Sequence, residues 1–373
     1  MIYLDCAATS LQKPAAVGVA AGNAVRRLAS PGRGGYPAAM DAADVLLDCR
    51  TELAGLFHVA DPARVIFTSG ATHGLNIAIR SLVSPGDRVV VTGYEHNAVI
   101  RPLYALGADI YVAASPLFDP DAAAEAFRRG LRGAKAAVCC HVSNVFGATA
   151  PLDRIAAMCR ASGVPLIVDA SQSAGSVPLD FDGLGAAFAA MPGHKGLLGP
   201  QGTGVLLVGG DAAPSPLLLG GTGSESELPV MPPYLPDRLE AGTHNMPGVA
   251  GLLEGVRWVR RHGTASVLRH ETRLRTLAAA LLSGHDGLEV FAAPDGAWQS
   301  GVLSVRPAAV DCEEAARRLA RRGIAVRAGL HCAPLAHRTA GTLDTGTVRL
   351  SFSPFTTERE VRAACAAILR LLK

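Results

Sequence analysis

Short apolar runs alternate with Ala-, Arg- and Glu-rich stretches between about residues 40 and 250. Each run is bounded by Gly, Pro or polar residues, which is the pattern of a buried strand. Strands that alternate with helical stretches are typical of an α/β fold with a largely parallel sheet. We therefore predict strands at Val65–Thr68, Arg88–Thr92, Asp109–Ala113, Ala136–His141, Pro165–Asp169, Ala186–Met191 and Gly204–Val208.

The pattern changes after the last of these runs. The Gly-, Pro- and Ser-rich stretch Pro214–Pro236 has no usable period and predicts a long loop, either functional or at an interface. A helix is expected from about Gly251. Asp311 with Glu314 can cap a later helix that has Cys312 in its first turn. The last helix begins with a capping box, Thr357 with Glu360, and its apolar face comprises Val361, Ala364, Cys365, Ile368 and Leu372.

Composition narrows the class of protein. The chain has 373 residues, of which 49% are hydrophobic and 18% charged, and its net charge is +3. This balance gives no support to nucleic-acid binding or to attraction to a membrane surface. The N-terminus lacks the pattern of a signal peptide, and no apolar run is long enough to span a bilayer. Eight Cys without a C-x-x-C pair suggest neither zinc nor disulfides, so we expect a cytoplasmic protein without a metal site.

The stretch Gly193-His194-Lys195-Gly196 follows one predicted strand and places a Lys between two glycines. Glycines allow a sharp turn and the close approach of a bulky group. Partial desolvation lowers the pKa of a Lys ammonium and makes the amine a good Schiff-base nucleophile. The alternative is an ordinary solvated loop Lys.

A second candidate is the turn Ser69-Gly70-Ala71-Thr72, between a predicted strand and a helix start. Such a turn can direct backbone N–H groups at a phosphate, with the Thr72 hydroxyl as a further donor. The spacing matches neither a Walker A loop nor a dinucleotide-binding turn. An ordinary turn in which Thr72 caps the helix is the alternative.

Other polar side chains also follow predicted strands. Asp169 ends one of them, and His96 and Asn144 come shortly after two others. In an open α/β sheet, this edge is where ligands bind. A carboxylate there suits a pyridinium nitrogen, and an imidazole can stack on an aromatic ring. The alternatives are a helix cap for Asp169 and structural roles for His96 and Asn144.

Taken in order, nine segments cover nearly the whole chain. They are Tyr3-Leu4-Asp5-Cys6-Ala7-Ala8-Thr9, the Ser-Gly-Ala-Thr turn, Glu95-His96, His141-Val142-Ser143-Asn144, Val168-Asp169 with Gln172, Gly193-His194-Lys195, Glu240-Ala241-Gly242-Thr243, Arg327-Ala328-Gly329-Leu330-His331-Cys332-Ala333-Pro334 and Thr347-Val348-Arg349. Their order and spacing resemble class V, fold-type I pyridoxal-phosphate enzymes, specifically the cysteine desulfurase and selenocysteine lyase branch. The resemblance implies a large domain of residues 15–250 with a mostly parallel sheet. It also implies a smaller α+β domain of residues 1–14 and 251–373.

The resemblance further implies roles in binding pyridoxal 5'-phosphate. Lys195 would hold the cofactor as an internal aldimine and later move the substrate α-proton. His96 would stack on the ring, Asp169 would pair with the ring nitrogen, and Gln172 would hydrogen-bond the phenolic oxygen. The phosphate would be bound by Ala71 through its N–H, Thr72, His194 and, from a second subunit, Thr243.

For the amino-acid substrate, the resemblance implies that Asn144 and Arg349 grip the carboxylate, with Arg327 nearby. Cys332 would receive the sulfur of cysteine as a persulfide and leave alanine. Its loop contains Arg327, His331 and His337, and positive neighbours stabilise the reactive thiolate. An inert buried thiol is the alternative for Cys332, and packing in the sheet is expected for Cys139 and Cys140.

The sequence departs from the family pattern at four positions. Pro192 stands where many relatives have a phosphate-binding Ser, and His73 replaces an acidic residue. Leu330 replaces a His beside the catalytic Cys, and Cys6 replaces an Asn. The departures at Pro192, His73 and Leu330 leave the substrate open between cysteine, selenocysteine and cysteine sulfinate.

We therefore predict a homodimeric cysteine desulfurase-like enzyme. The alternatives are a selenocysteine lyase, a cysteine-sulfinate desulfinase, a class V aminotransferase, a C–S lyase or a non-catalytic scaffold of the same fold. A protein that accepts the sulfur is a further candidate partner.

Overall fold

The predicted apolar runs pair into one central sheet. The protein is described by a computed structural model that covers residues 1–32 and 34–371. Within this part of the chain, the largest sheet has the strand order β2-β8-β7-β6-β5-β3-β4. Neighbouring strands from β4 to β7 are parallel, and β8 is antiparallel to β7 and β2. The strands are β2 (Val65–Thr68), β3 (Arg88–Thr92), β4 (Asp109–Ala113), β5 (Ala136–Cys140), β6 (Leu166–Asp169), β7 (Phe188–Pro192) and β8 (Gly204–Val208).

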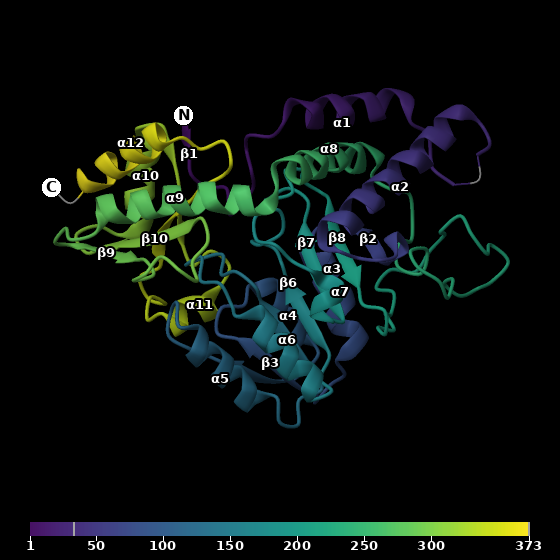
Figure 1. Cartoon of the computed structure of the whole chain (residues 1–373), viewed down its shortest axis with the longest axis horizontal. Coiled ribbons are helices and arrows are strands. Elements are labelled where there is room, and N and C mark those ends of the chain that lie inside the picture. The colour runs from purple at the N-terminus through teal and green to yellow at the C-terminus, as the bar shows by residue number, and fades with distance from the viewer. Residues whose placement is uncertain (33, 372–373) are drawn as a thin grey trace.

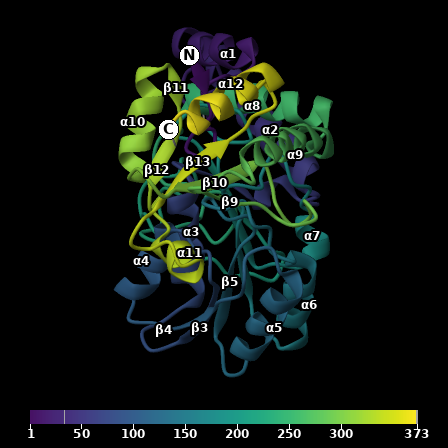
Figure 2. The ribbon, with the colours of Figure 1, turned by 90° about the vertical axis from the view of Figure 1, so that its left-hand side faces the viewer.

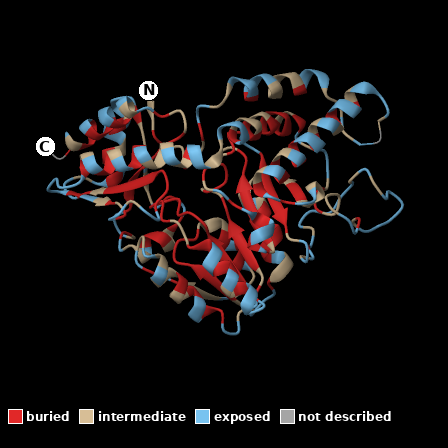
Figure 3. Ribbon diagram, viewed as in Figure 1, coloured by how far each residue is buried: buried red, intermediate tan, exposed pale blue. Residues whose placement is uncertain are grey.

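Both faces of this sheet are covered by helices, as Figure 1 shows. Successive strand residues point to opposite faces, so Val138 packs with α3 and α4 whereas Cys139 packs on the other side. The sheet is therefore buried on both sides except at the edge strand β4, where only Ala113 is buried, and this burial explains why the inner strands are largely apolar (Figure 3). The helices that precede α9 in the chain are α1 (Ala15–Arg27), α2 (Pro37–Phe57), α3 (Ala71–Leu82), α4 (Asn97–Ala105), α5 (Pro120–Gly130), α6 (Leu152–Ala161), α7 (Phe181–Leu184) and α8 (Met246–His262), with a 3-10 turn at Pro62–Arg64.

The C-terminal part of the chain forms a second, antiparallel sheet with the strand order β12-β13-β10-β9. The N-terminal strand β1 pairs with β11 rather than with the central sheet, so both termini lie beside these elements (Figures 1 and 2). The division into residues 15–250 and residues 1–14 with 251–373 stays a proposal, and this pairing is a structural reason for it. The elements are β1 (Ile2–Tyr3), α9 (Thr264–Leu282), β9 (Leu288–Phe291), β10 (Val302–Pro307), α10 (Cys312–Arg321), β11 (Ile324–Ala325), β12 (Arg327–Gly329), α11 (Pro334–Thr339), β13 (Thr347–Ser351) and α12 (Glu358–Leu369).

Local capping rules predict the C-terminal helices well. The reciprocal Thr357–Glu360 capping box is present, and Cys365 on the same helix is 1% exposed. Leu372, predicted on that apolar face, lies outside the described residues. The Asp311 side chain accepts hydrogen bonds from the backbone N–H groups of the next helix, whose Cys312 is buried.

One predicted helix start is wrong. The helix expected from about Gly251 begins at Met246 because the Asn245 side chain accepts a hydrogen bond from Gly248 N and Pro247 occupies the first turn.

Residues 214–236, all of which the structure describes, form neither helix nor strand. Leu219 and Val230 in this loop are 77% and 66% exposed, and the loop extends to the right in Figure 1. No helix among the described residues is long and apolar enough to cross a membrane.

Candidate active site

The side chains predicted from the strand ends meet at one edge of the central sheet. His96 follows β3, Asn144 follows β5, Asp169 ends β6, and Lys195 lies just beyond β7. Parallel neighbouring strands bring these positions together at their carboxyl ends. They line one cavity of about 290 Å³, whose wall is formed by Ser69, Gly70, Ala71, Thr72, His73, His96, Ala98, Cys140, Val142, Asn144, Asp169, Ser171, Gln172, Pro192, His194 and Lys195.

Lys195 lies where two cavities meet. Besides the cavity above, it lines a smaller one with Cys6 and Glu271. Burial lowers the pKa of Lys195 to about 8, and the nearby carboxylate of Asp169 limits the drop. An appreciable fraction of the amine is therefore uncharged near neutral pH, as a nucleophile or base requires.

Asp169 and His96 are both held by backbone groups. Asp169 is 3% exposed, and its Oδ1 accepts a hydrogen bond from Ser171 N at 2.9 Å. His96 precedes α4, and its Nδ1 accepts from Ala98 N at 3.0 Å. The ring proton of the neutral imidazole is therefore on Nε2. Burial lowers the pKa of His96, so the neutral ring dominates near neutral pH.

The N-terminus of α3 contributes the wall expected to bind phosphate. Gly70 stands at the N-cap, so the first turn has no side-chain cap, and Ala71 and Thr72 face the cavity. Backbone N–H groups in such a turn favour an anion. Pro192 lines the same cavity and supplies neither an N–H nor a hydroxyl.

His194 also lines this wall and is tied to the N-terminal segment. Its Nδ1 lies 3.0 Å from Thr9 Oγ1, and its carbonyl accepts from Ser10 N at 3.0 Å. Burial, together with the neighbouring ammonium groups of Lys195 and Lys13, lowers the pKa of His194 to about 4. His194 is therefore a neutral hydrogen-bonding group near neutral pH.

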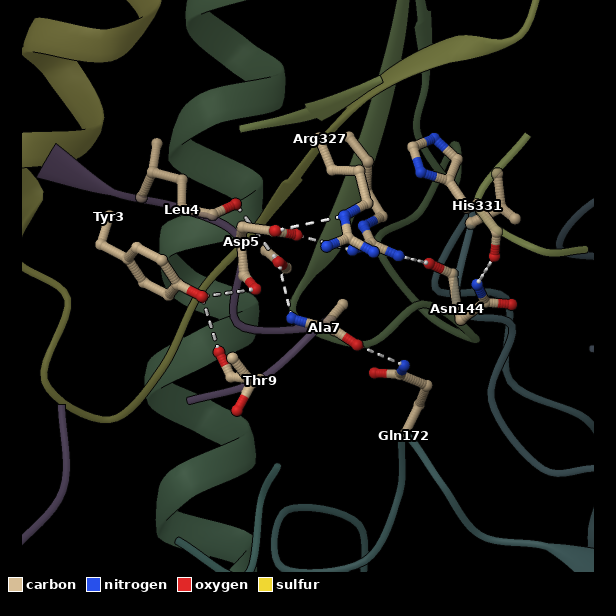
Figure 4. A network of polar contacts seen from close by, with 12 residues as sticks. Tyr3, Leu4, Asp5, Ala7, Thr9, Asn144, Gln172, Arg327 and His331 are labelled. Carbon is tan, nitrogen blue, oxygen red and sulfur yellow. Dashed lines mark hydrogen bonds and ion pairs between the residues drawn. The ribbon is translucent and has the colours of Figure 1, made fainter. Parts of the chain in front are cut away.

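The residues predicted to grip a substrate carboxylate are close to one another (Figure 4). Arg349, 2% exposed, donates to the carbonyl of Asn144 at 2.9 Å and to Asp5 Oδ1 at 2.7 Å. Arg327 Nε lies 3.2 Å from the other oxygen, Asp5 Oδ2. Gln172 Nε2 donates to the carbonyl of Ala7 at 2.9 Å, which leaves its second N–H available to a ligand.

Cys332 is exposed and belongs to a strained, closely held loop. His331 and Cys332 have φ values of 51° and 56°, a left-handed conformation that is unfavourable for residues with a side chain. The carbonyl of His331 accepts from Asn144 Nδ2 at 2.8 Å, and that of Cys332 accepts from Asn97 N at 2.8 Å. These bonds hold the thiol-bearing loop against Asn144 and the start of α4, which follows His96.

The prediction that His331 and His337 are positively charged neighbours of Cys332 is wrong. Burial lowers the pKa of His331 to about 2 and that of His337 to about 4. Both rings are therefore neutral near neutral pH, and they cannot act as the positive neighbours expected for Cys332. The Arg327 guanidinium, whose side chain is 49% exposed, pairs with Asp5.

Thr243 is not brought into the Lys195 cavity of its own chain. It is exposed and lines a neighbouring cavity that shares Ser69 and His73 with the first one. Because the prediction concerned Thr243 of a second subunit, it stays a prediction.

Sequence reasoning assigned no role to three acidic residues near the site. Asp5 pairs with Arg349 and Arg327. Glu95 is fully buried, and burial, together with nearby Asp169, raises its pKa to about 8. Burial likewise raises the pKa of Glu271 to about 8. Asp5 and Glu95 lie within the motifs that carried the resemblance, but no pattern in the sequence marks the partners of any of the three.

The comparisons with known proteins agree with this arrangement. The model of the Aminotransferase class-V family matches residues 2–363, and the chain belongs to that family. A Methanothermobacter thermautotrophicus protein named "Probable cysteine desulfurase" is 31% identical over 374 residues, 97% of this chain and 92% of that protein. Cysteine desulfurase CsdA of Escherichia coli is also 31% identical, over 100% of this chain and 94% of CsdA.

A solved structure supports the same family. The apo structure of cysteine desulfurase from Thermococcus onnurineus matches with a TM-score of 0.90 and 27% identity, covering 100% of this chain and 94% of that one. The predicted fold class and the resemblance to the cysteine desulfurase branch are thereby confirmed.

Proposed function

We propose that this protein is a pyridoxal-phosphate-dependent cysteine desulfurase that transfers the sulfur of L-cysteine to Cys332. One observation carries the proposal. An exposed thiol lies on a loop held by hydrogen bonds to Asn144 and to Asn97, the residue after His96. A thiol that accepts sulfur from a bound substrate has to reach the site and also solvent; the exposure of Cys332 and the bond from Asn144, which lines the Lys195 cavity, to the loop support this role.

The residues present fit pyridoxal 5'-phosphate. The α3 N-terminus at Ala71 and Thr72, together with neutral His194, suits the phosphate. The buried carboxylate of Asp169 suits a protonated ring nitrogen, and neutral His96 offers a flat ring for stacking. Lys195 supplies the amine for covalent attachment. When bound, this cofactor acts as an electron sink that stabilises negative charge next to the substrate α-carbon.

Each remaining role falls to a residue of this chain. Arg349 and Asn144 orient the substrate carboxylate, with Arg327 at the more exposed side. Lys195 Nζ, uncharged in part because its pKa is about 8, takes the α-proton. The same half-buried amine can then return a proton as alanine forms.

The sulfur step conserves atoms and electrons. The Cβ–S bond of L-cysteine breaks, and the sulfur atom forms a bond to Cys332 Sγ. The net change converts L-cysteine and the Cys332 thiol into L-alanine and a Cys332 persulfide. Because Cys332 is exposed, a thiol of a second protein or of a reductant can remove the terminal sulfur from the solvent side.

The proposed enzyme is a homodimer in which Thr243 reaches the phosphate site of the second copy. The exposure of Thr243 and its absence from the lining of its own chain's Lys195 cavity support this arrangement. Sedimentation analysis that finds a monomer at micromolar concentration would contradict it.

The function is tested by incubating the purified, cofactor-loaded protein with L-cysteine and a thiol reductant. We expect equal amounts of alanine and sulfide, and a mass increase of one sulfur atom on the Cys332 peptide when the reductant is omitted. The variant Cys332→Ala should lose at least about nine-tenths of sulfide release. Unchanged sulfide release would exclude the persulfide role, and faster alanine formation from selenocysteine or cysteine sulfinate would reassign the substrate.

A further inference from the structure

Asp5 joins the two arginines of the substrate-carboxylate site. Its Oδ1 accepts from Arg349 at 2.7 Å and its Oδ2 lies 3.2 Å from Arg327 Nε, so each carboxylate oxygen contacts a different guanidinium (Figure 4). The Asp5 side chain is 15% exposed and that of Arg349 is 2% exposed. An ion pair shielded from water to this degree is screened weakly by salt.

The sheet register explains why a carboxylate is needed at this point. Arg327 on β12 and Arg349 on β13 are directly opposite residues of an antiparallel pair. Like charges in directly opposite positions destabilise a sheet and push the side chains apart. A bridging carboxylate offsets one of the two charges and allows both guanidinium groups to remain on one side of the site.

The backbone on either side of Asp5 is hydrogen-bonded to Ser351 of β13, the strand that contains Arg349. Leu4 O accepts from Ser351 N at 2.8 Å, and Ala7 N donates to Ser351 Oγ at 2.8 Å. The Tyr3 hydroxyl donates to Asp5 O at 3.2 Å. These three contacts fix the backbone at Asp5 and on either side of it, and a displacement of Asp5 would break them.

Two buried atoms nearby point to the position of the ligand. Within residues 1–32 and 34–371, Arg349 Nε and Asn144 Oδ1 have no hydrogen-bond partner. Unpaired buried polar atoms are costly, and a ligand that both accepts and donates hydrogen bonds would satisfy these two. The carboxylate and the ammonium group of an amino acid provide both.

We propose that Asp5 is a positioning residue for substrate binding, which holds Arg349 so that its remaining N–H groups face the carboxylate of the amino acid. It acts by neutralising the repulsion between Arg349 and Arg327, and it does not touch the reacting atoms. This inference rests on the proposed function, since it assigns the carboxylate to an amino-acid substrate.

The test compares steady-state kinetics of the holoenzyme with those of Asp5→Asn. We expect the KM for L-cysteine to rise about fivefold or more while kcat changes less than about twofold, because orientation of Arg349 affects binding. A general loss of structure would instead lower kcat and the amount of active enzyme. A KM within about twofold of the wild-type value would overturn the proposal.

A double-mutant cycle isolates the repulsion. If Asp5 acts by neutralising the repulsion between Arg349 and Arg327, Asp5→Asn is less harmful in a chain that also carries Arg327→Gln. We expect the KM of the double variant to be at least about threefold lower than the product of the two single effects predicts. Additive effects would contradict the mechanism. Should Asp5→Asn fail to fold, Asp5→Glu, which keeps the charge on a longer side chain, is expected to raise KM with kcat retained.

Binding can also be measured without turnover, which separates this inference from the proposed function. L-alanine carries the same carboxylate and ammonium groups as the substrate, and ethylamine lacks the carboxylate. We expect L-alanine to raise the thermal midpoint of the wild-type protein more than that of Asp5→Asn, with no difference for ethylamine. Equal L-alanine shifts in the two proteins would overturn the role of Asp5, whatever the catalytic activity.

Discussion

The backbone N–H of Asn97 donates to the carbonyl of Cys332 at 2.8 Å, although the two residues are far apart in the sequence. Asn97 is the first residue of α4, and His96, which lines the Lys195 cavity, precedes it. The bond therefore connects the thiol loop with the wall of the cavity. Because Cys332 is in the left-handed conformation, the loop depends on such contacts to keep its shape.

Replacing Asn97 by Pro should loosen this loop without disturbing the helix. Proline is well tolerated at the first helical position, and the extended conformation of His96 (φ −74°, ψ 157°) is compatible with a following Pro. The substitution removes only the N–H that binds Cys332. We expect sulfide release to fall about two- to tenfold, since one net hydrogen bond contributes about 0.5–1.5 kcal/mol.

The matched control for this prediction is Asn97→Ala, which keeps the backbone N–H. It should release sulfide at a rate close to that of the wild type, and both variants should retain the cofactor absorbance. If Asn97→Pro and Asn97→Ala behave alike, the bond to Cys332 is irrelevant to sulfur transfer.

Two lysines near the site allow the attachment of the cofactor to be tested. Burial lowers the pKa of both Lys195 and Lys13 to about 8. Lys13 Nζ donates a hydrogen bond to Ser10 Oγ at 2.7 Å, whereas Lys195 faces the cavity. After borohydride reduction we expect the mass of the reduced cofactor on the Lys195 peptide in the wild type and in Lys13→Ala, and no covalent adduct in Lys195→Ala. An adduct on Lys13 would reject the assignment.

Glu95 should make stability depend on pH. Its pKa rises from 4.5 in the unfolded chain to about 8 in the folded protein, mainly because the side chain is buried and further because Asp169 is close. The folded state therefore holds a proton that the unfolded state loses between these values, and stability falls as pH rises through this range. Glu95→Gln keeps an oxygen that can accept from Thr92 and Cys140 and has no such proton to lose.

This prediction is measured by urea unfolding of the holoenzyme at pH 5.5 and 8. Relative to Glu95→Gln, the free energy of unfolding of the wild type should fall by roughly 3 kcal/mol between pH 5.5 and pH 8. The exposed Glu227→Gln should show the pH dependence of the wild type. A parallel response of wild type and Glu95→Gln would mean that Glu95 is not held protonated.

The buried pair Arg50–Glu240 should contribute to stability, and it lies next to the segment that carries Thr243. Arg50 is 7% exposed and Glu240 8%, and Glu240 also accepts from Phe67 N at 2.6 Å. Glu240→Gln leaves the Arg50 charge buried without a counter-ion, which should cost about 3–5 kcal/mol of unfolding free energy.

Chemical unfolding checks this value against the exposed pair Arg154–Asp121, whose side chains are 52% and 86% exposed. Asp121→Asn should cost less than about 1 kcal/mol. Similar losses at the two sites would show that burial does not strengthen the dependence of Arg50 on its partner.

Much of the candidate site could be predicted because it depends on local rules. Apolar runs identify β3, β5, β6 and β7, and their parallel arrangement places the following polar residues at one sheet edge. For this reason Lys195, Asp169, His96 and Asn144 line one cavity, as their positions in the chain predict. The roles of these residues toward the cofactor stay predictions.

What the sequence by itself determined is therefore the set of strands, their apolar character and the edge at which the chemistry-bearing residues gather. These properties follow from side-chain periodicity and turn preferences over a few residues. Only the tertiary structure decided that His331 and His337 are neutral, and that Asp5 pairs with Arg349, 344 residues away. Burial and ion pairing depend on neighbours brought together by folding, because desolvation and Coulomb energy depend on distance in space and not on separation along the chain.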